Sequence, residues 1–191
     1  MFKYFCTLFL FTVQKQLVVI IGGPGTGKTT IIQELSKRGH CCYGEISRDI
    51  TLEAKKQGID QLFLENPMLF SELLLNARKE QHQNASAEAH EFVFLDRGIP
   101  DVLAYMHYIG DPYPSFFDEA CKEHPYAKIF ILPPWEEIYE SDEARYENFA
   151  QAALIHKHIK ETYEKYGYNL IEVPKTDTNS RIMFILDLLS K

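Results

Sequence analysis

The sequence has few cysteines, no excess of basic charge and no long apolar run, and each shortage argues against a class of protein. Its four cysteines form no CxxC pair and no spacing matched by histidines, so neither a disulfide framework nor a zinc knuckle is indicated. The formal net charge of −7 argues against a nucleic-acid or anionic-membrane surface. We therefore expect a cytoplasmic protein without a nucleic-acid or membrane partner, in which any anion site is local.

The N-terminal residues are apolar, but the run from Phe5 to Val13 is too short to span a bilayer. It has the length of the apolar part of a signal peptide, yet no small-x-small cleavage site follows it. We predict that residues 1–14 are an extension outside the fold, with a membrane anchor as the alternative. Residues 15–191 are expected to form one domain, because 191 residues with 46% hydrophobic content can bury a single sizeable core.

The stretch VVIIGGPGTGKTT, residues 18–30, has the spacing of a phosphate-binding P-loop between a strand and a helix. Glycines let successive backbone N–H groups point at a polyphosphate, while the lysine reaches the β- and γ-phosphates and the threonine hydroxyl ligates Mg²⁺. The pattern therefore predicts an ATP and Mg²⁺ site. The residues expected to bind the nucleotide are Gly22, Gly23, Pro24, Gly25, Thr26, Gly27, Lys28, Thr29 and Thr30.

Five short apolar runs alternate with helical patterns, which indicates a parallel sheet covered on both faces. The fold class predicted is α/β, a three-layer P-loop NTPase with a five-stranded parallel sheet. The expected strands lie at 17–21 and near residues 41, 91, 127 and 168. One helix is expected directly after the P-loop. Further helices are expected over 46–57, 67–83, 99–109, 115–124, 143–166 and 179–189.

Ligands of such sheets bind beyond the carboxyl ends of the strands, so the polar residues there are the candidates for chemistry. Asp96, after the third strand, is expected to hold Mg²⁺ with Thr29; the alternative is a helix cap or an ion pair. Arg97 beside it offers a planar fork for a phosphate, unless it pairs with a neighbouring acid.

Two further residues follow the second strand. Glu45 could take the proton of an acceptor hydroxyl, or could simply complement the helix dipole. Arg48 lies one helical turn further on and is expected to bind the acceptor with Glu45 and Arg97.

The charged stretch near residues 135–150 is expected to form a lid over the site. Its Arg145 could neutralise the transferring phosphoryl group, or could belong to ordinary surface ion pairs. With Lys28, Glu45, Asp96 and Arg97, Arg145 completes the predicted catalytic set.

The segments GGPGTGKT, VFLDRGIPDVLAY, IFILPPWEEIYESDEARYENFAQA and YNLIEVP together resemble an AAA-domain-type family of predicted ATPases and kinases. This family is related to the nicotinamide-riboside kinase domain and, more distantly, to nucleoside and nucleotide monophosphate kinases. The resemblance covers about residues 16–189 and implies a sheet like that of the nucleoside monophosphate kinases, with Mg-ATP at the P-loop. It also places Glu45 where an acceptor-activating carboxylate sits, and matches Asp101 to a second acidic position without assigning it a role.

These observations predict a kinase that transfers the γ-phosphoryl group of Mg-ATP to a small hydroxyl-bearing metabolite, such as a nucleoside or a nucleotide. The alternative is a nucleotide-binding switch that acts on a partner. A guanine-specific GTPase is a poor match, because the sequence PKTD at residues 174–177 lacks the asparagine of Asn-Lys-x-Asp.

Overall fold

The computed structural model describes residues 15–59, 62–139 and 147–190. Its centre is a five-stranded sheet with the order β2-β3-β1-β4-β5, in which every neighbouring pair is parallel. The predicted fold class is confirmed. The strands are β1 (Gln16–Ile21), β2 (Cys41–Tyr43), β3 (Phe92–Asp96), β4 (Lys128–Ile131) and β5 (Leu170–Glu172).

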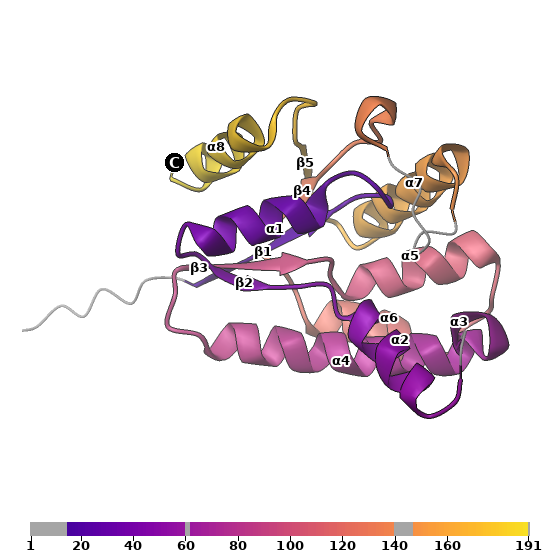
Figure 1. Cartoon of the computed structure of the whole chain (residues 1–191). Coiled ribbons are helices and arrows are strands. Elements are labelled where there is room, and N and C mark those ends of the chain that lie inside the picture. The colour runs from indigo at the N-terminus through magenta and orange to yellow at the C-terminus, as the bar shows by residue number, and fades with distance from the viewer. Residues whose placement is uncertain (1–14, 60–61, 140–146, 191) are drawn as a thin grey trace, which may run out of the picture.

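Helices follow or separate the strands, as a parallel sheet requires for its crossover connections (Figure 1). They are α1 (Lys28–Lys37), α2 (Ser47–Lys56), α3 (Leu62–Glu65), α4 (Pro67–Ala87), α5 (Ile99–Ile109), α6 (Phe116–Glu123), α7 (Phe149–Lys165) and α8 (Thr178–Leu189). A short 3₁₀ helix, η1 (Glu136–Ile138), follows β4.

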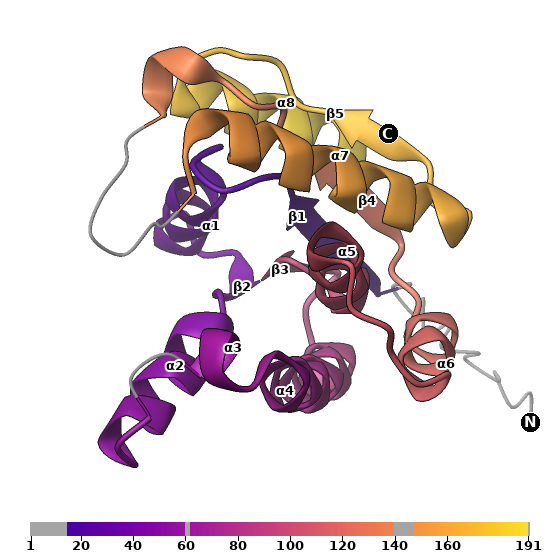
Figure 2. The same cartoon turned by 90° about the vertical axis from the view of Figure 1, so that its right-hand side faces the viewer.

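Both faces of the sheet are buried, which explains why β1 is a continuous apolar run. Val18 and Ile20 belong to the core under α1 and α8, whereas Val19 and Ile21 belong to the core under α4, α5 and α7. Figure 2 shows this arrangement, with α1, α5 and α7 close around β1. Because helices cover both faces, the predicted site lies in the loops at the carboxyl ends of the strands.

The helix expected over 143–166 is shorter than predicted, because it begins at Phe149. Asn148 is its N-cap: the Asn148 side chain accepts a hydrogen bond from the Gln151 N–H, and the Gln151 side chain accepts one from the Asn148 N–H. This capping pair marks the start of the helix, which the sequence prediction placed at residue 143. Arg145 and the middle of the expected lid, residues 140–146, lie outside the described residues.

Two other elements differ from the sequence prediction. The helix α4 continues to Ala87 rather than ending near residue 83, and the short α3 and η1 were not expected. Within the described ranges, we find no helix whose length and apolar character would allow it to cross a bilayer.

Candidate functional site

The P-loop runs from the end of β1 to the start of α1, and its glycines are required by close contacts. Gly22 has a φ of +143°, and a Cβ atom there would lie 2.5 Å from the Leu132 carbonyl oxygen. Gly25 has a φ of +74°, and a Cβ atom would lie 2.5 Å from the Tyr139 ring. Side chains are therefore excluded at Gly22 and Gly25 by the backbone conformation and by contacts with the segment that follows β4.

The Gly22→Ala variant is expected to lose nucleotide binding and to unfold more readily than Gly39→Ala. Both glycines have positive φ, but a Cβ atom at Gly39 would meet no atom within 4 Å, whereas one at Gly22 would face a backbone carbonyl. Strained backbone costs about 1–3 kcal/mol in each variant, and only Gly22→Ala must also move the backbone at Leu132, directly after β4. Thermal denaturation and nucleotide titration measure both effects. Equal losses in the two variants would contradict the steric argument.

Lys28, the first residue of α1, lies buried against the loop. Its Nζ donates to the Gly23 carbonyl oxygen at 2.8 Å and to Thr26 Oγ1 at 3.4 Å. Burial and the nearby Arg97 guanidinium lower the pKa of Lys28 to about 7. The ammonium group is therefore poorly solvated and weakly paired. An anionic phosphate beside it would stabilise its charged form.

Thr29 and Asp96 meet across the loop. Thr29 Oγ1 donates to Asp96 Oδ2 at 3.1 Å. The other oxygen, Oδ1, is buried and has no hydrogen-bond partner within the part of the chain that the structure describes. Burial raises the pKa of this carboxyl above its ordinary value, although Lys28 opposes the shift. A hydroxyl and an unpaired carboxylate oxygen at a P-loop fit the oxygen ligands that Mg²⁺ takes, so these residues fit the metal.

An ion-pair cluster lies beyond β2 and β3. The Glu45 carboxylate accepts a hydrogen bond from Arg78 Nη2 at 2.8 Å and forms an ion pair with Arg97 Nε. Arg78 Nη1 also donates to the Asp96 carbonyl oxygen at 3.3 Å. The cluster thus ties α4 to the carboxyl ends of two strands.

The two arginines control the charge of Glu45. Burial alone would raise its pKa, but Arg78 and Arg97 outweigh burial and lower the pKa to about 2. Glu45 is therefore ionised at neutral pH. It is a weak base, but its carboxylate oxygens accept hydrogen bonds.

Arg97 is held in an unusual backbone conformation. Its φ is +73°, a value that non-glycine residues rarely adopt, and its N–H donates to the Ile20 carbonyl oxygen at 3.0 Å. Asp101 accepts from Arg97 Nη1 at 3.2 Å, from the Gly98 N–H at 2.9 Å and from the Tyr163 hydroxyl at 2.7 Å. Asp101, for which the sequence suggested no role, thus caps α5 and orients Arg97.

A second arginine missed in the sequence lies on the α8 side of the P-loop. Arg181 Nη1 donates to the Thr26 carbonyl oxygen at 3.0 Å, and its guanidinium lies 4.9 Å from the centre of the Trp135 ring. No sequence signal marked Arg181, because Thr26 lies 155 residues before it.

The structure brings together most of the residues predicted for the site. The P-loop, Glu45, Asp96 and Arg97 lie at the carboxyl ends of β1, β2 and β3, where ligands of parallel sheets bind.

Arg48 is exposed on α2 and is not among the described residues that pair with Glu45. The partners of Glu45 are Arg78, Arg97 and the Ser47 N–H instead. A binding role for Arg48 stays a prediction, as does the role of Arg145.

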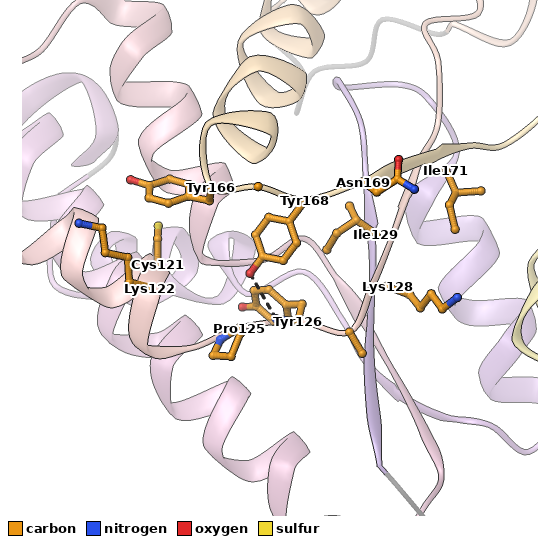
Figure 3. A pocket seen from close by; sticks show the side chains of 12 residues that line it. Cys121, Lys122, Pro125, Tyr126, Lys128, Ile129, Tyr166, Tyr168, Asn169 and Ile171 are labelled. Carbon is orange, nitrogen blue, oxygen red and sulfur yellow. Dashed lines mark hydrogen bonds between the residues drawn. The ribbon is translucent and has the colours of Figure 1, made fainter.

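A cavity of about 630 Å³ lies elsewhere, at the amino-terminal ends of β4 and β5. Figure 3 shows its lining, which includes Lys128, Ile129 and the Tyr126 and Tyr168 rings. These residues precede or open the two strands, whereas the P-loop follows β1. The cavity is therefore separate from the P-loop and the ion-pair cluster.

Together, the fold and the phosphate-binding loop define a P-loop protein of the α/β class with a sheet like that of nucleotide kinases. The sequence profile of the AAA domain family matches residues 17–181, and the chain belongs to this family. A search of curated proteins gives no match to the sequence.

Solved structures with the same fold include several kinases. Deoxyadenosine kinase from M. mycoides is 18% identical with a TM-score of 0.67, over 91% of this chain and 98% of that one. Thymidylate kinase from Candida albicans is 17% identical with a TM-score of 0.66, over 93% and 92% of the two chains. The NadR protein in complex with NR is 18% identical with a TM-score of 0.72, over 92% of this chain and 50% of that one. At these identities, the likeness establishes the fold.

Proposed function

We propose that this protein is a kinase that transfers the γ-phosphoryl group of Mg-ATP to the hydroxyl group of a small metabolite. The observation that carries the proposal is the Glu45, Arg78 and Arg97 cluster beside the P-loop. A protein that only binds nucleotide needs the loop, whereas a kinase also needs groups that bind and orient an acceptor.

On the nucleotide side, the loop N–H groups and Lys28 hold the β- and γ-phosphates, while the positive end of α1 faces the anion. Thr29 Oγ1 and Asp96 Oδ1 would hold Mg²⁺. When bound, this ion would neutralise negative charge that develops on the phosphate during transfer. The buried and unpaired Asp96 oxygen supports this assignment.

On the acceptor side, Glu45 accepts the hydrogen bond of the attacking hydroxyl and fixes its direction toward the γ-phosphorus. Its low pKa suits this positioning role, because phosphoryl transfer through a loose transition state needs little help from a strong base. Arg97 is rigidly held by Asp101 and supplies positive charge for an anionic or polar acceptor. Deoxyadenosine kinase and thymidylate kinase share the fold, which supports a nucleoside or nucleotide as the acceptor.

The test is ADP formation by the purified protein with Mg-ATP and a panel of nucleosides, nucleotides and ribosylated metabolites. We expect ADP formation to depend on one class of acceptor and to give a product heavier by one phosphoryl group in mass spectrometry. Tight ATP binding with no acceptor dependence across the panel would contradict the kinase and favour a nucleotide-controlled switch.

The pKa of Lys28 makes nucleotide binding pH-dependent. In the free protein this pKa is about 7, so most of the amine is neutral at pH 8. Phosphate beside the amine favours the charged form and raises its pKa, and we therefore expect ATP binding at pH 8 to take up close to one proton. ATP affinity should fall as the pH rises above 7, until the pKa of the bound state is reached.

Calorimetry in buffers with different enthalpies of ionisation measures this proton uptake. The Lys28→Met variant is the control, because it lacks the titrating amine but keeps the loop. Equal proton uptake by the two proteins would show that another group titrates.

A further inference from the structure

Three side chains of the types that ligate metals lie at the opposite end of the sheet from the P-loop. Cys41 opens β2, while Glu88 and His90 lie in the connection between α4 and β3. The Cys41 thiol, the Glu88 carboxylate and the His90 imidazole each offer one ligand atom, and these atoms all lie within 4.8 Å of one another. None of these residues takes part in the function proposed above.

The backbone explains why these side chains meet. Cys41 and Tyr43 are two residues apart in β2 and pack on the same core, whereas Cys42 packs on the core of the other face. Glu88 follows the end of α4 in an extended conformation, with φ of −58° and ψ of 153°. The Tyr43 hydroxyl donates to Glu88 Oε1 at 2.8 Å and so orients this carboxylate toward β2.

We propose that Cys41, Glu88 and His90 form a Zn²⁺ site with one open position. A thiolate, an imidazole and a carboxylate together are ligands that zinc accepts in tetrahedral sites, whereas Mg²⁺ requires oxygen ligands. Three protein ligands leave the fourth position of the tetrahedron for water or an exchangeable ligand.

The site closes around the metal with a small movement. Zinc–ligand distances of ~2.0–2.3 Å place two ligand atoms of a tetrahedron ~3.3–3.7 Å apart, so no separation needs to shrink by more than ~1.5 Å. His90 is exposed, while Cys41 and Glu88 are half-buried. Rotation of the His90 side chain can therefore supply most of the movement while β2 stays in register.

Zinc at this position would fasten an edge of the sheet. Among the described strands, the edge strand β2 has three residues and pairs only with β3, whereas Glu88 and His90 belong to the segment that leads into β3. A metal bound to both segments binds the folded state and hardly the unfolded one, so it raises the melting temperature.

The test uses the full chain, freed of metal with a chelator under reducing conditions, and Co²⁺ as a spectroscopic substitute for Zn²⁺. We expect a thiolate-to-cobalt charge-transfer band that Zn²⁺ displaces, and a higher melting temperature with Zn²⁺. The Cys41→Ser variant should lose the band. The Cys42→Ser variant is the matched control, since it removes the neighbouring thiol on the opposite face, and it should keep the band.

Two further variants separate ligation from folding. His90→Ala changes an exposed side chain, so it should fold normally and bind Zn²⁺ at least about 10-fold more weakly. Tyr43→Phe removes the hydrogen bond to Glu88 and should weaken binding by about 10–100-fold, as loss of an outer partner does at zinc sites. The absence of a thiolate band in the parent protein, or an unchanged band in Cys41→Ser, would overturn the proposal. Unchanged zinc affinity in His90→Ala would also overturn it.

Discussion

Replacing Lys28 with methionine is expected to lower phosphoryl transfer by about 10²–10³-fold, the loss typical when a group that stabilises transition-state charge is removed. The Lys28 ammonium is the buried cation in the P-loop itself, 2.8 Å from the Gly23 carbonyl oxygen. Methionine has a similar length and is apolar, so it fills the same space without the charge. Steady-state kinetics with the identified acceptor measures the loss.

The fold should survive this change. Burial of a charged lysine opposes folding, as the lowered pKa of Lys28 shows, so methionine should leave the melting temperature unchanged or raise it slightly. Lys37→Met is the matched control, because Lys37 lies at the other end of α1 in an exposed pair with Glu34. It should keep full activity. A Lys28→Met protein that folds and still transfers at the parent rate would contradict the assigned role.

Replacing Arg78 with methionine is expected to lower the free energy of unfolding by about 3 kcal/mol, near the lower limit for breaking a buried ion pair. Arg78 is buried, and its loss leaves the Glu45 carboxylate with Arg97 as its remaining ion-pair partner and removes the bond to the Asp96 carbonyl oxygen. For a chain of this size, the loss lowers the melting temperature by about 6–12 °C.

A control and a double variant test the physical cause of that loss. Arg38→Met removes an exposed arginine that bonds to Asn179, and it should cost about 0.5 kcal/mol or less. If the buried Glu45 carboxylate is left with too little positive charge beside it, adding Glu45→Gln to Arg78→Met should restore part of the stability. A melting temperature for Arg78→Met equal to that of Arg38→Met would contradict the structural role.

The sequence by itself determined the local parts of this protein. The P-loop could be read directly, because its chemistry needs glycines, a lysine and a threonine at fixed spacing within a few residues. The five strands could be predicted from short apolar runs, which in the central strands β1, β3 and β4 result from burial on both faces. A parallel sheet then predicts that Glu45, Asp96 and Arg97 lie at one edge, since all five strands end on the same side.

Only the tertiary structure decided which distant residues complete the sites. Arg78 stands beside Lys79 and Glu80 and looks like surface charge until α4 packs against the ends of β2 and β3. The contact of Arg181 with Thr26 and the approach of Cys41 to Glu88 and His90 likewise join segments far apart in the chain. Such pairs depend on how helices and strands pack. Packing is determined by residues throughout the core, so the spacing of neighbouring residues does not predict it.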